Sequence, residues 1–264
     1  MKDIIPDVTQ YMREHTGRDL SIEELAGRYG YSKFHFSREF RKALGVTPNE
    51  YWAALKMEQS LMELGRTHSI LNAHMRAGYQ STGTFVSSFK KSTGFTPGQY
   101  QEEIQKQSMF RDAKQFEGSG DKVITHYSFD KNDPATRQTH KLSIICHMPD
   151  GFRGLIFVGM FAKPLPVEAP VLGKAMSKGN RCVIDQIPNG EYYALVCAIK
   201  SNANPLTYFQ PKHWLRDLHR EPYRFPLEED EQIEFTLREE DPTDPAIPRN
   251  PVKLLVDVLR SRER

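Results

Sequence analysis

The first 107 residues carry apolar side chains at the spacing of amphipathic helices. Two runs repeat at intervals of three and four residues: Ile22, Leu25, Ala26 and Tyr29, then Phe36, Phe40 and Leu44. Helix-capping signals stand between such runs, as Ser21 with Glu24, Thr47 with Glu50, and Thr96 with Gln99. Pro48 and Pro97 suit the first position of a helix. The pattern predicts an all-α region whose apolar stripes form its core.

The pattern changes beyond residue 121, where short β-rich runs replace the helical spacing. These runs are Val123–Phe129, Leu142–His147, Leu155–Phe161, Cys182–Ile187, Tyr192–Ile199 and Ile233–Leu237. Pro188-Asn189-Gly190 predicts a hairpin turn between two of them. Two helices are expected here, over Lys212–His219 and Val252–Arg260. Strands at this spacing favour a β-sandwich or a small barrel.

These two sequence patterns divide the chain into a domain over residues 1–107, a linker over residues 108–121, and a second domain over residues 122–264. The Gly-Ser-Gly sequence at the end of the middle segment is typical of linkers. The acidic run Glu228–Glu231 is expected to be a solvent-exposed loop. A length of 264 residues fits two domains.

Composition supports folded domains and narrows the cellular setting. Hydrophobic residues make up 38% of the chain and the net charge is only +2, so the protein as a whole is no general polyanion binder. We find no apolar run of about 18 residues and no signal peptide, and so we expect no membrane association. The three widely spaced cysteines form neither a zinc pattern nor a disulfide framework. We expect buried thiols and a cytoplasmic location.

The first domain contains an internal repeat. Gly30-Tyr31 recurs as Gly78-Tyr79, an offset of 48 residues. The segment Phe36–Tyr51 recurs in outline as Phe85–Tyr100, an offset of 49 residues. Each copy predicts a helix, a tight glycine turn, a second helix, then Gly-x-Thr-Pro and a further helix. A glycine in a short turn between helices is typical of the helix-turn-helix motif.

The helix after the first glycine turn has a face suited to DNA. Its apolar side chains lie on one side, while Lys33, Phe34, Ser37, Arg38 and Arg41 lie on the other. A helix fits the major groove, and an arginine can bind guanine through two hydrogen bonds. Basic residues such as Lys42 suit phosphates. Charged faces are usually only solvated surfaces, but the repetition at fixed spacing favours DNA binding.

The run Gly30–Lys42 and the closing pattern Phe85…Phe89-Lys90-Lys91…Gly94-Phe95-Thr96-Pro97…Tyr100 resemble the DNA-binding module of the AraC/XylS family of transcription regulators. The first run is especially similar to the reading helix of the MarA, SoxS and Rob group. The resemblance covers residues 4–103.

This resemblance implies two homeodomain-like helix-turn-helix units joined by a long helix over Asn49–Gly65, which bind two adjacent major-groove segments of double-stranded DNA. It also implies RNA polymerase as a partner if the protein is an activator. By analogy, Phe34, Ser37 and Arg38 face bases in the first unit. The full set of expected DNA-binding residues is Lys33, Phe34, Ser37, Arg38, Arg41, Lys42, Ser81, Thr82, Gly83, Val86, Ser87, Lys90 and Lys91.

The second unit departs from the family pattern, because Ser87 stands where the family usually has arginine. Val86 and Gly83 beside it read few base features. We therefore expect the second unit to hold phosphates, through Lys90, Lys91 and the start of its helix, more than it reads bases.

The second domain is expected to be a mainly-β sandwich, which makes the chain an α+β multidomain protein. Residues 156–171 and 187–195 resemble a transthyretin-like sandwich. The alternative is the α+β effector domain of the Rob type, which also follows its DNA-binding module. That type has two long helices, and residues 122–200 show no pattern for them.

No catalytic pattern emerges from the second domain, and we expect no enzyme activity, metal or cofactor. His213 and His219 are six residues apart, which places them on different faces of a helix. Tyr208, Phe209 and Trp214 are candidates for an apolar ligand pocket, although dense aromatic residues more often pack a loop onto a core. Two functions remain open for this domain: a site for a small-molecule effector, or a dimerisation or protein-interaction module without a ligand. The oligomeric state stays open as well.

Overall fold

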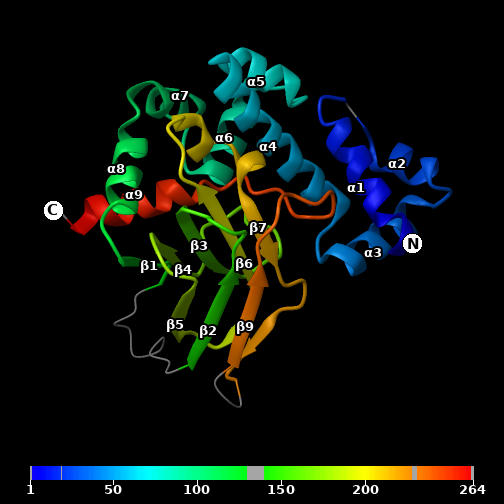
Figure 1. Ribbon diagram of the computed structural model, residues 1–264. Coiled ribbons are helices and arrows are strands. Elements are labelled where there is room, and N and C mark those ends of the chain that lie inside the picture. Colours follow the sequence, from blue (N-terminus) through cyan, green and yellow to red (C-terminus); the bar gives the residue numbers. More distant parts are fainter. Residues whose placement is uncertain (1, 19, 130–139, 228–230, 263–264) are drawn as a thin grey trace. The chain divides into compact units, whose positions relative to one another are not determined.

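The structure is a computed structural model that describes residues 2–18, 20–129, 140–227 and 231–262 (Figure 1). The chain forms two compact units. Unit 1 comprises Met1–Gln105, Pro164–Val167 and Asp241–Arg249, and unit 2 comprises Lys106–Lys163, Glu168–Glu240 and Asn250–Arg264.

This division differs from the expected boundaries, which assigned everything beyond residue 121 to the second domain. Two short segments of the C-terminal half belong to unit 1, because Leu165 and Ala246 are buried in its hydrophobic core. The expected linker is also wrong over most of its length. Residues 108–117 form helix α8 (Ser108–Glu117). The helix is stabilised by the burial of Met109, Ala113 and Phe116.

Unit 1 is helical, as expected. Its elements are the short helix η1 (Lys2–Ile4) and the helices α1 (Ile5–Glu14), α2 (Ile22–Arg28), α3 (Lys33–Leu44), α4 (Pro48–Thr67), α5 (Ile70–Arg76), α6 (Thr82–Thr93) and α7 (Pro97–Lys106). The predicted caps begin α2, α4 and α7. Ser21 and Glu24 exchange hydrogen bonds, as do Thr47 and Glu50. Thr96 and Gln99 do the same at α7.

The sequence repeat produces two helix-turn-helix units with matching cores. In the first, Phe36 lies against Phe40, and Phe40 meets the edge of Tyr51 with ring centroids 5.6 Å apart. In the second, Phe85, Phe89 and Tyr100 repeat this arrangement, again at 5.6 Å for each pair. The turn glycines Gly30 and Gly78 have φ angles of +75° and +63°, a region that favours glycine.

Unit 2 is built on two β-sheets. Its strands are β1 (Val123–Tyr127), β2 (His140–His147), β3 (Gly154–Phe161), β4 (Leu172–Met176), β5 (Arg181–Ile187), β6 (Gly190–Lys200), β7 (Leu215–Leu218), β8 (Tyr223–Phe225) and β9 (Glu231–Thr236). The larger sheet has the order β1-β4-β3-β6-β7, with β8 also paired to β6. The smaller sheet has the order β5-β2-β9, in which β2 and β9 run parallel.

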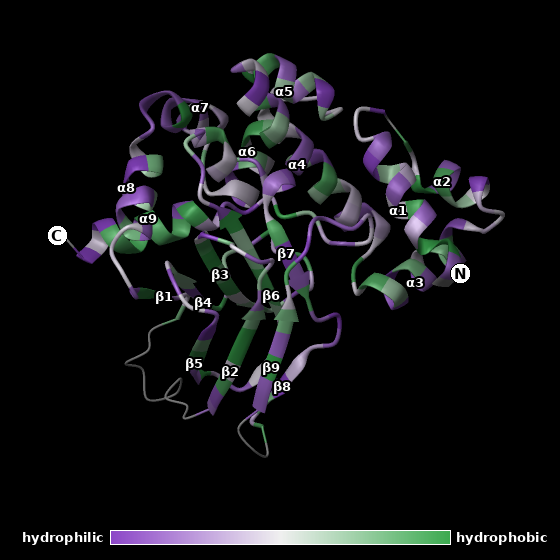
Figure 2. Ribbon diagram, in the orientation of Figure 1, coloured by the Kyte–Doolittle hydropathy of each residue, from purple (hydrophilic) through white to green (hydrophobic). Residues whose placement is uncertain are grey.

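The two sheets share one hydrophobic core, which makes unit 2 the expected mainly-β sandwich. The smaller sheet contributes buried residues such as Ile144 and Phe235, and the larger sheet contributes Val158 and Val196. Figure 2 shows the central strands β3 and β6 as predominantly hydrophobic. They are also buried on the opposite face, as Phe157 demonstrates. Helix α9 (Pro251–Arg262) packs with α8 and β1.

Two further expectations for unit 2 are wrong. The helix expected over Lys212–His219 does not form, because Pro211–His213 makes a single short turn (η3) before strand β7 (Leu215–Leu218). The β5–β6 connection at Asn189-Gly190 is not a hairpin between paired strands, since β5 pairs with β2 and β6 pairs with β3. The chain crosses here from one sheet to the other. The expected acidic loop at residues 228–231 lies almost wholly outside the described residues.

The three cysteines Cys146, Cys182 and Cys197 are buried in unit 2, as expected. Burial raises their thiol pKa values to about 12, 11 and 12, respectively. Because the thiolate is the reactive form, we predict that none of them reacts with a thiol reagent at pH 8 in the folded protein. Titration should give three thiols after unfolding in denaturant. Rapid labelling of a native cysteine would contradict this prediction.

Candidate DNA-binding interface and ligand pocket

Helix α3 presents one polar face to solvent. The Ser32 hydroxyl accepts a hydrogen bond from the His35 backbone N–H and so caps the first turn, while Gly45 at φ +75° ends the helix. Phe36 and Phe40 are fully buried and fix which face is exposed. Lys33, Phe34, Arg38, Arg41 and Lys42 are exposed, and Ser37 is half-buried. The structure therefore brings the residues predicted for the first unit together on the outer face of one helix.

Two residues that the sequence analysis missed hold Arg38. Its Nη2 lies 3.1 Å from Nδ1 of His35, and its Nε lies 3.6 Å from a carboxylate oxygen of Glu39. The side chain of Arg38 is still 73% exposed. The ring of His35 stacks on Tyr31. An arginine held in this way is partly preorganised, because its neighbours restrict the rotamers that it samples.

Phe34 is the most exposed large apolar side chain among the described residues, at 87%. It occupies the first turn of α3, where a helix in the major groove meets base edges. An exposed phenyl ring is costly in water and suits contact with a thymine methyl group. A single exposed apolar residue is common on protein surfaces, so the exposure of Phe34 alone does not indicate DNA contact. Its position in the first turn of α3 is what favours such a contact.

Helix α6 presents the matching face of the second unit. Ser81 caps the helix by accepting a hydrogen bond from the Thr84 backbone N–H. The exposed residues predicted for DNA binding are Ser81, Thr82, Gly83, Ser87, Lys90 and Lys91, whereas Val86 is half-buried. The hydroxyl of Ser87 donates to the backbone oxygen of Gly83 at 2.7 Å. Its proton is thus used within the helix, which weakens the case for base reading at this position.

The aromatic residues predicted to line a ligand pocket divide into two groups. Tyr208 and Phe209 are fully buried and do not line the pocket described below, which corrects the prediction for these two residues. The hydroxyl of Tyr208 donates to Glu117, and its ring meets Phe110 edge-on. They pack the segment after β6 onto α8, because an apolar loop is stable only against other apolar surface. Trp214 does line the pocket.

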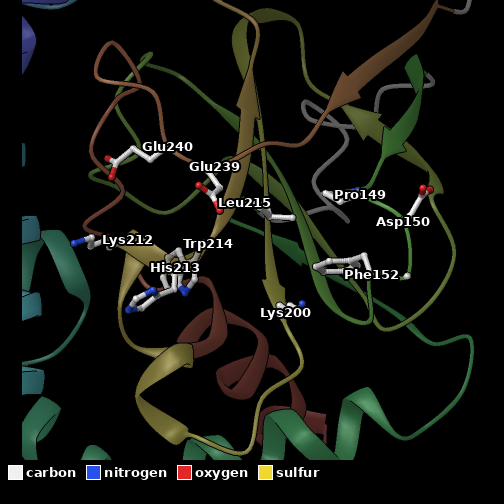
Figure 3. A pocket seen from close by; sticks show the side chains of 11 residues that line it. Pro149, Asp150, Phe152, Lys200, Lys212, His213, Trp214, Leu215, Glu239 and Glu240 are labelled. Atoms are coloured by element: carbon white, nitrogen blue, oxygen red, sulfur yellow. The ribbon is translucent and has the colours of Figure 1, made fainter.

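This pocket of unit 2 has a volume of about 580 Å³ and mixed chemistry (Figure 3). Its apolar lining comes from Pro149, Phe152, Trp214 and Leu215. Its charged lining comes from Asp150, Lys200, Lys212, Glu239 and Glu240, and His213 adds a further polar side chain. The indole N–H of Trp214 donates to the backbone oxygen of Thr207 at 2.8 Å, which fixes the ring. Glu240 pairs with the buried Arg216 at 3.2 Å.

The pocket thus offers the half-buried ring of Phe152 beside charges of both signs, whereas the side chain of Trp214 is itself only 1% exposed. Sites of this size that combine apolar walls with a few polar groups bind small molecules in many proteins. The sequence analysis found only one of these residues, since the lining comes from four separate segments that come together only in the folded sheet. The described residues contain no group of three or more His, Cys, Asp or Glu side chains that could hold a metal ion.

Comparison with known proteins finds a family that matches the helix-turn-helix units. The helix-turn-helix domain family matches residues 25–103, which span most of α2 through α7. Residues 25–103 are an AraC-type helix-turn-helix domain. This domain holds both glycine turns, the helices α3 and α6 that follow them, and the connecting helix α4.

The AraC-type domain has relatives among bacterial regulators. An uncharacterised HTH-type transcriptional regulator of Staphylococcus aureus is 31% identical over 99 residues, which cover 37% of this chain and 13% of the relative. The right origin-binding protein of Escherichia coli is 32% identical over 98 residues, which cover 37% of this chain and 34% of that protein. The chain thus matches only a minor part of either relative.

Among solved structures, the C-terminal domain of AraT, a response regulator from Geobacillus stearothermophilus, is 29% identical. The match covers 38% of this chain and 84% of that domain, with a TM-score of 0.36. The DNA-binding domain of AdpA, solved with a target DNA, is 24% identical over 39% of this chain and 95% of that chain, with a TM-score of 0.37. No helix within the described ranges has the length and apolar character needed to cross a membrane.

Proposed function

We propose that this protein is a DNA-binding transcription regulator that uses α3 and α6 to contact two adjacent major-groove segments. The observation that carries the proposal is the repeated reading helix in the AraC-type domain, with its exposed basic face on α3. Helix α4, 20 residues long, joins the two units and has buried residues along most of its length. A long buried helix resists bending, so it supports a fixed distance between the two reading helices.

A footprint on genomic fragments tests this proposal. Two reading helices in one chain should contact grooves about one helical turn, ~34 Å, apart on one face of the DNA. We expect one chain to protect a non-palindromic site of roughly 20 bp. Protection of only a strict palindrome, with one major groove used per chain, would refute the two-groove arrangement. No saturable binding to any fragment would refute DNA binding itself.

Lys91 provides a prediction about the phosphate contacts of the second unit. Its side chain is exposed in the last turn of α6, where it can reach the DNA backbone but not base edges. We predict that Lys91→Ala weakens binding to all sequences by similar factors and lowers the slope of log K against log salt by about one unit. Lys114 in unit 2 offers a control, because Lys114→Ala should leave the salt slope unchanged. A change in sequence preference in the Lys91 variant would contradict a phosphate role.

For unit 2, we propose that the pocket at Trp214 binds a small molecule that modulates the activity of the regulator. The aromatic and charged lining favours a small amphipathic molecule with at least one ionised group. The alternative, an interaction module without a ligand, would need a contiguous apolar patch. The large apolar side chains exposed among the described residues of unit 2 are Val123 and Val183, at 47% and 43%. Single residues of this kind do not favour the alternative.

A thermal-shift screen of metabolites on the intact protein separates these two functions. A ligand at 100 times its Kd stabilises its protein by about 2.7 kcal/mol, which is readily measured. We expect a hit to stabilise the wild type but not His213→Ala, whose substitution removes an exposed side chain at the pocket. Native mass measurement alongside tests the alternative: a stable dimer without any stabilising compound would favour the interaction module.

A further inference from the structure

A proline-rich segment of the C-terminal half is an internal part of unit 1. We call Asp241–Arg249 the strap. It holds three prolines in nine residues, and Asp244 through Pro248 are buried. Prolines restrict the unfolded chain, so fixing this segment costs less entropy than fixing an ordinary loop. The strap belongs to neither a helix nor a strand, and its backbone oxygens must therefore find partners elsewhere.

Two side chains of the first helix-turn-helix unit supply those partners. Arg13 of α1 donates from Nε to the Pro242 oxygen at 3.1 Å and from Nη2 to the Asp244 oxygen at 2.6 Å. The hydroxyl of Tyr51 lies 3.1 Å from the Pro242 oxygen and 3.0 Å from the Asp244 oxygen. Two carbonyl groups of the strap thus share two donors, one charged and one neutral, in a partly buried setting.

The strap continues along α4 beyond this anchor. The backbone N–H of Ile247 donates to Glu58 at 3.2 Å, and the same carboxylate lies 3.4 Å from Arg13. At the end of the strap, Arg249 donates to the backbone oxygen of Lys91 at 3.3 Å, in the last turn of α6. The strap therefore contacts both helix-turn-helix units.

A second segment of the C-terminal half, Pro164–Val167, lies at the end of α3. Leu165 is 5% exposed and packs in the same core as Phe36 and Phe40. A Cβ placed on Gly45, the residue that ends α3, would lie 2.8 Å from Cγ of Pro164. Glycine thus permits this close approach, because a Cβ at this point would require Pro164 to move and the φ of +75° also favours glycine.

From these contacts we propose that the strap and Pro164–Val167 position the first reading helix, α3. The path is short: the strap oxygens bind the Tyr51 hydroxyl, the ring of Tyr51 packs on Phe40, and Phe40 is the buried side of α3. Arg13, Tyr51 and Leu165 are positioning residues for this helix. The proposal rests on the proposed DNA binding only for its consequence on sequence recognition.

Both segments are inserted into unit 1 from stretches of chain that otherwise belong to unit 2. The strap follows β9 and precedes α9, and Pro164–Val167 lies between β3 and β4. The core of unit 1 is therefore completed by residues that lie far beyond its helices in the sequence.

Hydrogen exchange on the full-length protein tests the positioning without DNA. Tyr51→Phe removes only the hydroxyl that binds the strap, and Arg13→Met removes the charged anchor. We expect Tyr51→Phe to raise the exchange rates of the strap and of the α3 amides roughly two- to tenfold, the effect of losing one neutral hydrogen bond, and Arg13→Met to raise them at least as much, while α6 stays protected. Tyr100→Phe, the matched change in the second unit, is the control and should leave α3 unaffected.

Binding titrations then connect positioning to recognition. The full-length variants are titrated with the footprinted site and with versions substituted in the half beneath α3 or beneath α6. We expect Arg13→Met and Tyr51→Phe to lower discrimination only against substitutions beneath α3. A reduced folded fraction would lower all affinities equally and would leave these ratios unchanged.

The two measurements fail independently. If the strap amides lose protection and α3 does not, the positioning role is wrong. If the amide exchange rates of the strap and of α3 are unchanged in both variants, Arg13 and Tyr51 do not hold the strap, and the proposal is also wrong. If the wild type binds no DNA, the proposed function fails while exchange still decides the positioning. Should Arg13→Met not fold, Tyr51→Phe carries the test alone, because it keeps the ring and its packing.

Discussion

Leu165→Ala is expected to destabilise unit 1 by about 2–5 kcal/mol, although Leu165 stands some 60 residues beyond the end of the AraC-type domain. Its side chain fills space between apolar residues that belong to helices of the first helix-turn-helix unit. Truncation removes buried methyl groups and leaves a cavity, because a closely packed core relaxes only partly to fill it. A residue of an ordinary surface loop would give at most about 0.5 kcal/mol.

The two tryptophans of the chain allow this effect to be located. Trp52 is 7% exposed in the core of unit 1, and Trp214 is 1% exposed in unit 2. Fluorescence-detected denaturant unfolding is measured in Trp214→Phe and Trp52→Phe backgrounds, each with and without Leu165→Ala. We expect the transition reported by Trp52 to shift to lower denaturant concentration.

Val183→Ala is the control for this experiment, because Val183 is 43% exposed on strand β5 of unit 2. It should change stability by no more than about 0.5 kcal/mol at either tryptophan. An unchanged Trp52 transition in the Leu165 variant would show that Pro164–Val167 lies on the domain without stabilising it. It would also remove one of the two supports of the positioning proposal.

The helices of unit 1 were predictable because their signals are local. A capping residue, a carboxylate or amide three positions later and an apolar stripe lie within one or two helical turns of each other. Ser21, Thr47 and Thr96 all begin helices as predicted. The repeat strengthens each signal by presenting it twice, and the predicted reading-helix residues accordingly lie on the outer faces of α3 and α6.

Strand partners and long-range packing could not be predicted in the same way. The runs that form the strands were recognised, but Asn189-Gly190 carries the local chemistry of a hairpin while β5 and β6 join different sheets. The burial that β5 and β6 gain by pairing with β2 and β3 outweighs the local preference of Asn189-Gly190 for a hairpin turn. The strap shows the same limit. Three prolines in nine residues are typical of a surface loop. The strap instead packs into unit 1, where it is bound by Arg13 and Tyr51, which lie about 190 to 230 positions away in the sequence.

Residue 38 is where we expect the largest effect on sequence recognition. Arg38→Ala should weaken binding to the specific site by about 1–3 kcal/mol and relax preference at one base pair, because a bidentate contact to guanine is lost. His35 and Glu39 hold the guanidinium before binding, so DNA must compete with both. His35→Ala is therefore a useful companion, since it should alter affinity without abolishing the preference.

The second unit makes the expected result asymmetric. Ser87 stands at the position matching Arg38, and its hydroxyl already donates to the Gly83 oxygen. Gly83 offers no side chain, and the half-buried Val86 can contact at most a thymine methyl group. Sequence information should therefore be concentrated in the half of the site beneath α3. The other half should depend mainly on DNA shape.

Binding of every single-base variant of the footprinted site measures this asymmetry directly. Ser87→Arg should raise affinity for some sites with guanine beneath α6, since it restores a long donor at an exposed position of that helix. The opposing possibility is that Thr84 or Ser88, shifted by the extra residue in the second turn, contacts the bases instead. Thr84→Ala would then remove a preference that Ser87→Ala leaves intact. Equal information in both halves would show that α6 reads bases through residues other than those aligned with α3, because Ser87, Gly83 and Val86 cannot supply it.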